Sequence, residues 1–262
     1  YLQSKLGDRE TLHIFYAELN SKDLMHSFSD GNRWKNETID GDGANIQKVN
    51  LFPRGKTASD VSGSNACVVT NSTIQVFYRD ETEGILLGAV KTSNGWVYEI
   101  VDGDTLKNGR TTGDVAFSLK AISNKNYVYV LYDSVLSRNS AGQTTQSEMR
   151  FSTRGTVFPE DWKYKTLDGP DQGSAVAGFA TAISNIKGRI ILAWLNSTSN
   201  SYPRASQLIT YELRDSVITK SIQAGNFGEI ANPLVLNKDT IVFGCLTRIC
   251  KLSNNEQQPK LV

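Results

Sequence analysis

A strand pattern that recurs five times along the chain constrains the fold more than any other feature. Each copy is a short segment of alternating apolar character, which in most copies ends in an aromatic residue. The copies are residues 12–16, 74–78, 128–132, 190–194 and 241–245, and their starts are 62, 54, 62 and 51 residues apart. Alternation with a period of two residues predicts β-strands, and a turn and a second short apolar segment precede each copy. The chain is therefore a repeated β unit.

Two further signals recur with this pattern. Trp34, Trp96 and Trp162 each begin a fourth strand that runs into an Asp-Gly turn, at residues 40–41, 102–103 and 168–169. Glycine supplies the positive φ that such a turn needs.

Four strands per repeat without helical periodicity predict an all-β fold, a five-bladed β-propeller with four antiparallel strands per blade. The domain is 1–262, and the expected blades are approximately 1–44, 45–103, 104–169, 170–225 and 226–262. A two-sheet sandwich is the alternative, but it gives no reason for the recurring Trp and Asp-Gly signals.

Composition excludes several classes of function. The formal net charge is +1, which argues against a nucleic-acid or membrane-surface partner, and no apolar run is long enough to span a bilayer. Two histidines and three cysteines argue against a metal site. Nucleotide, phosphate-loop and nucleophile-elbow motifs are absent from the sequence, so we expect no cofactor.

Glycosylation sequons begin at Asn36, Asn71 and Asn196. Cys245 and Cys250 flank a short turn, and we expect a disulfide across that hairpin, with Cys67 left over. We therefore predict a secreted protein, whose signal peptide would have been removed before Tyr1.

Propeller geometry brings several long loops to one face, which predicts the site there. Arg79 is the expected catalytic hydrogen-bond donor, with Tyr78 beside it, although an Arg among carboxylates could also form only an ion pair. The residues expected to line the substrate pocket are Phe52, Tyr202, Phe227 and Asp133.

An acidic residue precedes the first strand of three repeats, at Asp60, Asp114 and Glu229. Paired carboxylates at a channel mouth would suit glycoside hydrolysis. The alternative, which the repetition favours, is that each carboxylate accepts backbone N–H groups in its turn. His13 and His26 lie on adjacent strands, where a structural role is more common than a catalytic one.

Residues 74–80, followed by Gly84-Ile85 and Gly95-Trp96, resemble the repeat of fungal fucose-binding lectins, and residues 12–34 match it as well. The resemblance implies a propeller that binds sugars through an Arg and a third-strand Glu of each repeat. The third strands expected here, at 24–27, 85–88 and 148–151, carry no recurrent Glu, and Arg79 has no counterpart in the other repeats. This divergence predicts one asymmetric site instead of several equivalent ones.

The chain is also similar to secreted fungal propeller proteins that act as hetero-Diels–Alderases. That resemblance implies a cofactor-free enzyme that joins an o-quinone methide to a terpene alkene in tropolone sesquiterpenoid biosynthesis. Such an enzyme would act by holding two small hydrophobic substrates together in a dry pocket, with Arg79 as donor. We take this cyclase as the first expectation, a glycan-binding lectin of the fucose type as the alternative, and a propeller glycoside hydrolase as the third.

Overall fold

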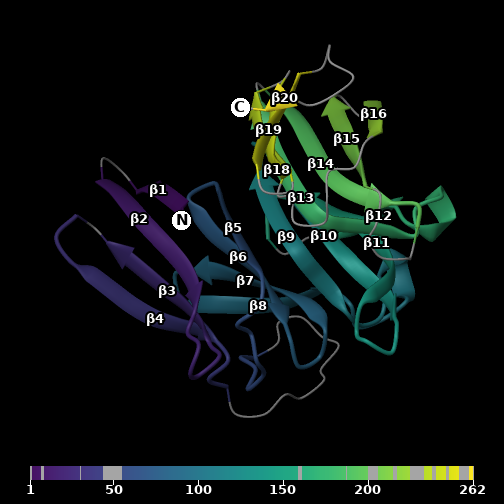
Figure 1. The fold of residues 1–262 in the computed structure, drawn as a ribbon. Coiled ribbons are helices and arrows are strands. Elements are labelled where there is room, and N and C mark those ends of the chain that lie inside the picture. The colour runs from purple at the N-terminus through teal and green to yellow at the C-terminus, as the bar shows by residue number, and fades with distance from the viewer. Residues whose placement is uncertain are drawn as a thin grey trace. The chain divides into compact units, whose positions relative to one another are not determined.

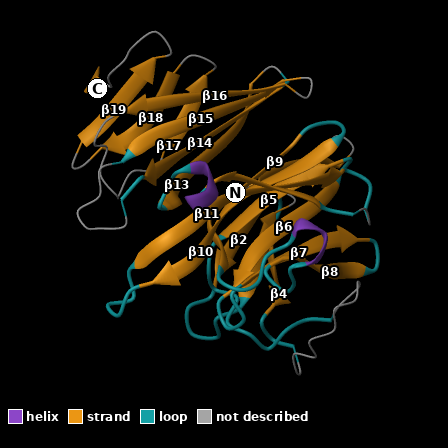
Figure 2. Cartoon of the chain, turned by 90° about the vertical axis from the view of Figure 1, so that its right-hand side faces the viewer, coloured by secondary structure: helices purple, strands orange, loops and turns teal. Residues whose placement is uncertain are grey.

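The chain forms strands almost throughout the part that the structure describes. The computed structural model describes residues 2–6, 9–29, 31–43, 55–158, 161–186, 188–199, 206–214, 217–224, 233–237, 240–245, 248–253 and 260–261. Two 3₁₀ turns, η1 (Lys107–Gly109) and η2 (Pro170–Gln172), are the helical segments in these ranges (Figure 2). Within the same ranges, no helix has the length and apolar character needed to cross a membrane.

The described strands form five four-stranded sheets, each a meander in which chain neighbours pair. The first two sheets contain β1 (Leu2–Leu6), β2 (Arg9–Ala17), β3 (Leu24–Ser29) and β4 (Trp34–Asp40), then β5 (Asn65–Thr70), β6 (Thr73–Asp80), β7 (Ile85–Thr92) and β8 (Gly95–Asp102). The third contains β9 (Val115–Ser123), β10 (Tyr127–Arg138), β11 (Thr144–Gly155) and β12 (Lys163–Asp168). The last two contain β13 (Val176–Ile186), β14 (Arg189–Ser197), β15 (Gln207–Arg214) and β16 (Val217–Ala224), then β17 (Pro233–Asn237), β18 (Thr240–Cys245), β19 (Arg248–Ser253) and β20 (Lys260–Leu261).

The predicted all-β class with antiparallel four-stranded sheets is confirmed. Each aromatic-ended segment lies within the second strand of its sheet, namely β2, β6, β10, β14 or β18. The blade limits and the closure of five blades into one propeller stay predictions.

The strands belong to two compact units. The first unit comprises Tyr1–Tyr129 and Thr153–Tyr164, and the second comprises Val130–Ser152 and Lys165–Val262. In the first unit, the strand β5 contacts β1 and β2 of the first sheet and β9 of the third. The first strands of successive sheets are therefore neighbours (Figure 1).

An apolar core holds the first two sheets together. Leu24 and Ile39 of the first sheet pack with Val76, Leu87 and other buried residues of the second. Their side chains are fully buried, and each such burial stabilises the fold by about 1.5–3 kcal/mol. In the second unit, Trp194 is fully buried and stacks on Tyr211 with ring centroids 5.1 Å apart.

The Asp-Gly turns join successive sheets. Asp40, Asp102 and Asp168 are fully buried, and the Oδ1 atom of each accepts a hydrogen bond from the N–H of the next glycine, at 3.0, 2.9 and 3.0 Å. Gly103 has φ +103°, and a Cβ there would lie 2.9 Å from the Ile85 Cα atom, so the turn requires glycine.

The second oxygen of this Asp accepts a hydrogen bond from the aromatic residue that the strand pattern singled out. Tyr78 Oη donates to Asp40 Oδ2 at 2.5 Å, and Trp194 Nε1 donates to Asp168 Oδ2 at 2.8 Å. In these two cases the recurring Asp-Gly and the recurring aromatic residue therefore form one structural contact.

Candidate functional site

The guanidinium of Arg79 is bound by other groups of the protein. The residue is 4% exposed; its Nε donates to Glu81 at 2.8 Å, one terminal nitrogen donates to Asp114 at 2.9 Å, and the other donates to the Val115 carbonyl. The guanidinium also stacks on the Phe117 ring at 3.9 Å. Every nitrogen thus has a protein partner, and the ion-pair alternative is the better description. The guanidinium is buried, whereas the side chains of Glu81 and Asp114 are 36% and 38% exposed.

Of the other predicted site residues, the structure describes Tyr78 and Asp133. Tyr78 is fully buried and donates to Asp40, so its role is the sheet contact described above. Asp133 is 5% exposed and belongs to the second unit. The predicted pocket residues Phe52, Tyr202 and Phe227 lie outside the described residues.

Two of the acidic residues that precede a first strand, Asp60 and Asp114, bind cations. Asp60 accepts from the Ser62 N–H at 3.1 Å and from Lys22 Nζ at 2.8 Å, and these contacts, with the Lys22 hydrogen bond largest, lower the pKa of Asp60. Asp114 binds Arg79, and Glu229 lies outside the described residues. The turn-stabilising role is thus the one that fits Asp60.

A cluster that joins the first two sheets has the composition of a binding site. The carboxylate of Glu37, on β4, accepts from His26 Nδ1 on β3 at 2.9 Å, from Trp96 Nε1 on β8 at 3.0 Å and from Lys91 Nζ on β7 at 2.8 Å. The side chains of Glu37 and Lys91 are 30% and 34% exposed, and Trp96 is half-buried. We call these four residues the first junction.

The two oxygens of Glu37 differ in this cluster. Oε1 accepts from all three donors, whereas Oε2 accepts from Lys91 alone among the described residues, at 2.8 Å. Burial raises the pKa of Glu37, but the hydrogen bonds from Lys91, His26 and Trp96 outweigh it, and the net effect lowers that pKa. The junction therefore presents an ionised carboxylate that still has accepting capacity at the surface.

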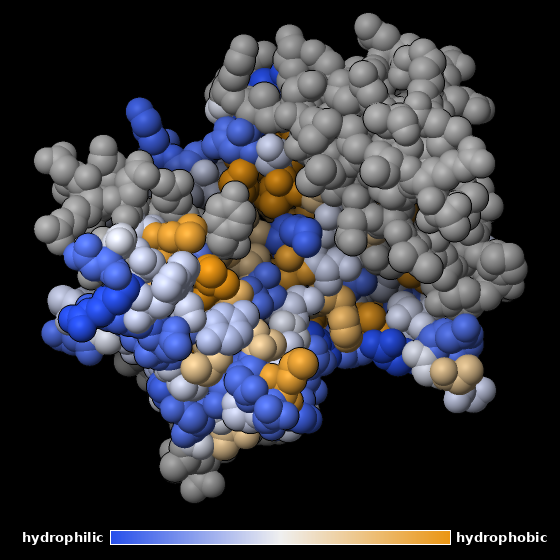
Figure 3. All heavy atoms as spheres, turned by 60° about the vertical axis from the view of Figure 1, so that its left-hand side comes forward, coloured by the Kyte–Doolittle hydropathy of each residue, from blue (hydrophilic) through white to orange (hydrophobic). Residues whose placement is uncertain are grey.

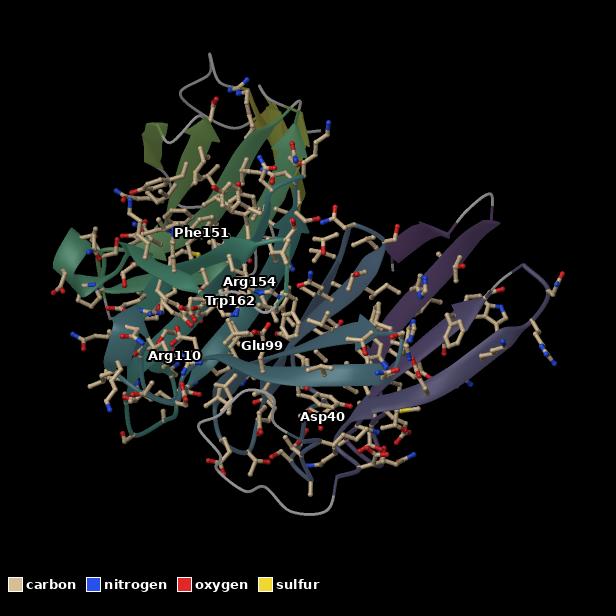
Figure 4. The ribbon with its side chains drawn as sticks, turned by 180° about the vertical axis from the view of Figure 1, so that it is seen from behind. Asp40, Glu99, Arg110, Phe151, Arg154 and Trp162 are labelled. Carbon is tan, nitrogen blue, oxygen red and sulfur yellow. The ribbon has the colours of Figure 1, made fainter. Side chains whose placement is uncertain are left out.

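A second junction repeats this chemistry in buried form. Glu99, on β8, accepts from Trp162 Nε1 at 3.1 Å and from Arg154 on β11 at 3.3 Å (Figure 4). Arg154 also donates to Gln75 at 2.6 Å, and its guanidinium lies over the Trp162 and Phe158 rings at 4.8 and 5.0 Å. The side chains of Glu99 and Arg154 are 9% and 0% exposed, so this junction is closed to ligands.

One signal could have revealed both junctions. The spacing Trp-x-x-Glu occurs at residues 34–37 and 96–99, while residues 162–165 read Trp-x-x-Lys. The Trp residue recurs in three repeats, and a Glu three residues later recurs with two of them. The prediction that third strands lack a recurrent Glu holds, because the carboxylate comes from the fourth strand.

Among the described residues, the exposed large apolar side chains are scattered. The large apolar residues with the greatest exposure in the described part, Leu19, Leu106 and Val157, belong to three separate loops. On the face shown in Figure 3, apolar residues lie in small groups between hydrophilic ones.

The predicted modifications receive different environments. Asn36 and Asn71 are exposed, whereas Asn196 is 3% exposed and donates to Asp168 at 3.0 Å and to Ser174 at 2.6 Å, which leaves no room for a glycan there. The register pairs Cys245 with Arg248 and Phe243 with Cys250, so the two cysteines are not opposite each other. Glycosylation at Asn36 and Asn71, the disulfide and secretion stay predictions.

Known proteins resemble this chain in fold and not in sequence. No family model and no curated protein matches the sequence. A puromycin-hydrolyzing peptidase of Mycobacterium tuberculosis is similar in structure, with TM-score 0.51, 10% identity and coverage of 99% of this chain and 38% of that one. A xylan β-1,4-xylosidase of Bacillus halodurans C-125 has TM-score 0.48 and 12% identity, and the match covers 82% of this chain and 42% of the xylosidase. An endo-arabinase of Bacteroides thetaiotaomicron VPI-5482 has TM-score 0.38 and 15% identity, and the match covers 99% of this chain and 91% of the arabinase. The chain spans less than half the length of the first two.

The predicted hetero-Diels–Alder cyclase is wrong. The donor that the cyclase requires, Arg79, is bound by protein groups on every nitrogen. Small hydrophobic substrates likewise have no support in the described residues, where the partly exposed cluster around Glu37 is polar and charged.

Proposed function

We propose that the chain is a glycan-binding protein built as a five-bladed propeller, with its saccharide site at the first junction. The observation that carries the proposal is the Glu37 carboxylate, which is partly exposed, ionised and held from two sheets by His26, Lys91 and Trp96. The five meandering sheets and the likeness to the peptidase at TM-score 0.51 support the propeller.

The chemistry of the junction suits a sugar. Adjacent hydroxyl groups both donate and accept, so they can bridge the Glu37 carboxylate and the Lys91 ammonium. An indole offers an apolar face for the C–H groups of a sugar ring, and Trp96 is half-buried beside these charges. The resemblance of residues 12–34 and 74–96 to fungal fucose-binding lectins supports the same ligand class, although His26, and no glutamate, lies on the third strand of the first sheet.

At the two junctions, the described carboxylates favour binding over hydrolysis. A glycoside hydrolase needs two carboxyl groups facing one bond, about 5–10 Å apart. Burial raises the pKa of Glu99, which would suit a general acid, but this residue is 7% exposed and held by Arg154. Glycan binding without cleavage is therefore the expected activity.

Neutralising Glu37 should abolish most of the binding. We expect Glu37→Gln to weaken affinity for L-fucose or the best saccharide of a glycan array by about 10- to 100-fold, because hydrogen bonds to a charged group contribute about 1.5–3 kcal/mol. Calorimetry measures the affinity, and Lys91→Met provides a second variant. Both proteins are first compared with the wild type by thermal unfolding, so that a loss of fold is recognised.

Glu18→Gln is the matched control. The Glu18 carboxylate accepts from the N–H groups of Asn20 and Ser21 in its own turn, at 3.0 and 2.6 Å, and touches neither junction. Its affinity should stay within about twofold of the wild type. Equal binding by Glu37→Gln, or no binding to any saccharide, would contradict the proposal, and release of reducing sugar would establish the hydrolase instead.

A further inference from the structure

Trp34 differs in exposure from the two other tryptophan residues that begin a fourth strand. The indole of Trp96 donates to Glu37 of the preceding sheet, and the indole of Trp162 donates to Glu99, so both rings are half-buried. Trp34 belongs to the first sheet and is 52% exposed. Single exposed apolar residues are common, but this ring stands where the repeat covers its counterparts in the next two sheets.

A glycosylation sequon lies on the same face of β4 as this ring. Successive side chains of a strand point to opposite faces, so Trp34, Asn36 and Thr38 share one face. The pairing of β3 with β4 is regular over residues 34–38, which preserves the alternation. Glu37 lies on the other face, where it bonds to the second sheet. The asparagine is therefore about 7 Å along the strand from the residue with the exposed indole.

The three sequons differ in the state of the amide nitrogen, which is the atom that carries an N-linked glycan. Asn71 Nδ2 donates to Thr156 at 3.3 Å, and Asn196 Nδ2 is buried and donates to two side chains. At Asn36, which is exposed, the bond to Ser27 Oγ uses the amide oxygen instead, at 2.6 Å. Among the described residues, Asn36 is thus the sequon asparagine whose nitrogen makes no bond to the protein.

The groups around Asn36 suit the first sugar of such a glycan, N-acetylglucosamine. An indole offers an apolar face to the C–H groups of a sugar ring, and a spacing of two residues on one strand face brings the attached ring within reach of Trp34. Ser27 and Ser29 pair with Asn36 and Trp34 in the register, and both are half-buried. Their hydroxyl groups can bond to the polar groups of the same sugar.

We propose that Asn36 carries an N-linked glycan whose first sugar packs on Trp34 and stabilises the first sheet. The transfer forms a bond between Asn36 Nδ2 and C1 of N-acetylglucosamine, and it breaks the bond from C1 to a lipid-linked diphosphate, which leaves. One proton leaves the amide nitrogen. The lipid-linked donor belongs to the secretory pathway, the compartment predicted from the sequence.

The position of β4 in its sheet leaves room for a bulky group. The first strands β1, β5 and β9 are neighbours, and the sheet order puts β4 at the edge away from them (Figure 1). Covering the indole removes apolar surface from water, which favours the folded state. Another protein surface is the other cover that would suit Trp34, and it would leave no space for a sugar on Asn36.

Mass spectrometry of glycopeptides gives the first test. The full chain is secreted from a eukaryotic host behind a cleavable signal peptide. We expect a glycan on Asn36 in most molecules and none on Asn196 in the folded protein, because Asn196 is buried. An unmodified Asn36 would overturn the proposal.

Thermal unfolding measures the stabilisation. Asn36→Gln removes the glycan, and we expect the melting temperature to fall by about 2–4 °C relative to the glycosylated wild type. An endoglycosidase that leaves one N-acetylglucosamine should preserve the melting temperature within about 1 °C, since the first sugar makes the contact. Asn71→Gln is the matched control, because no aromatic residue stands two positions before this sequon, and its effect should also stay within about 1 °C. If trimming costs as much as Asn36→Gln, the contact with Trp34 is not the source of the stability and the proposal fails.

Trp34→Ser tests whether the indole is the partner of the sugar. In this background, Asn36→Gln should change the melting temperature by no more than about 1 °C. In nuclear magnetic resonance spectra of the trimmed protein, the ring current of Trp34 should shift the C–H protons of the sugar upfield, and Trp34→Ser should remove the shift. An equal loss of stability in both backgrounds, or unchanged sugar signals, would refute the contact. Because Glu37 lies on the opposite face, these outcomes leave the proposed saccharide site to its own test.

Discussion

Replacing Arg154 with methionine should lower the free energy of unfolding by about 3–5 kcal/mol at neutral pH. Arg154 is 1% exposed, and it supplies the cation for Glu99, a hydrogen bond to Gln75 and the guanidinium that stacks on Trp162. Methionine keeps much of the volume but leaves the Glu99 carboxylate buried without its cation. Denaturation in urea, followed by tryptophan fluorescence, measures the loss.

The pH dependence of this loss identifies its cause. Burial raises the pKa of Glu99, and Arg154 opposes that effect, so removal of Arg154 should raise this pKa further. An acid whose pKa is raised by folding gains stability as the pH falls from the folded value toward the unfolded one. The deficit of Arg154→Met should therefore shrink as the pH falls toward the ordinary value of 4.5, because the folded protein takes up a proton at Glu99 above that pH.

Two controls separate charge from packing. Adding Glu99→Gln to Arg154→Met removes the stranded charge and should restore most of the stability, since a buried pair can often be replaced together with little loss. Lys22→Met breaks an ion pair that is shorter, at 2.8 Å to Asp60, but its side chain is 59% exposed, and we expect no measurable change. Equal effects of Arg154→Met and Lys22→Met would contradict the argument.

The strands could be predicted because their signals are local. Alternation, turn residues and aromatic ends place residues 12–16, 74–78 and 190–194 in second strands, and the structure has them in β2, β6 and β14. The Asp-Gly turns were equally clear, since only glycine accepts the φ values found there. What the pattern did not reveal is that Tyr78 and Trp194 donate to these aspartates.

The site could not be predicted because its contacts cross between sheets. Glu37 meets Lys91 and Trp96, which are 54 and 59 residues further along the chain, and no local pattern reports which side chains will face each other there. Arg79 shows the same difficulty: its partner Asp114 lies 35 residues away, and without it the guanidinium looked available to a ligand. Only the recurrence of Trp-x-x-Glu carried information about these contacts.

Removing the Asp168 carboxylate should cost the second unit about 4–5 kcal/mol, a large effect for one substitution. Four donors converge on this fully buried side chain: the Gly169 N–H at 3.0 Å, Ser174 Oγ at 2.6 Å, Trp194 Nε1 at 2.8 Å and Asn196 Nδ2 at 3.0 Å. In Asp168→Ala they are left buried without this acceptor, and a buried polar group without a partner costs about 1–3 kcal/mol.

Asp168→Asn refines this prediction because it keeps the volume and one oxygen. The new amide must direct N–H groups at donors, either at Ser174 and Gly169 or at Trp194 and Asn196, so we expect a loss of about 2–4 kcal/mol. Asp171→Asn is the control: this exposed residue lies three positions further on, and its substitution should change stability by no more than about 0.5 kcal/mol. If Asp168→Asn were as stable as Asp171→Asn, the Asp-Gly turn would be a local turn signal only, and something other than the carboxylate would hold Trp194 against the preceding sheet.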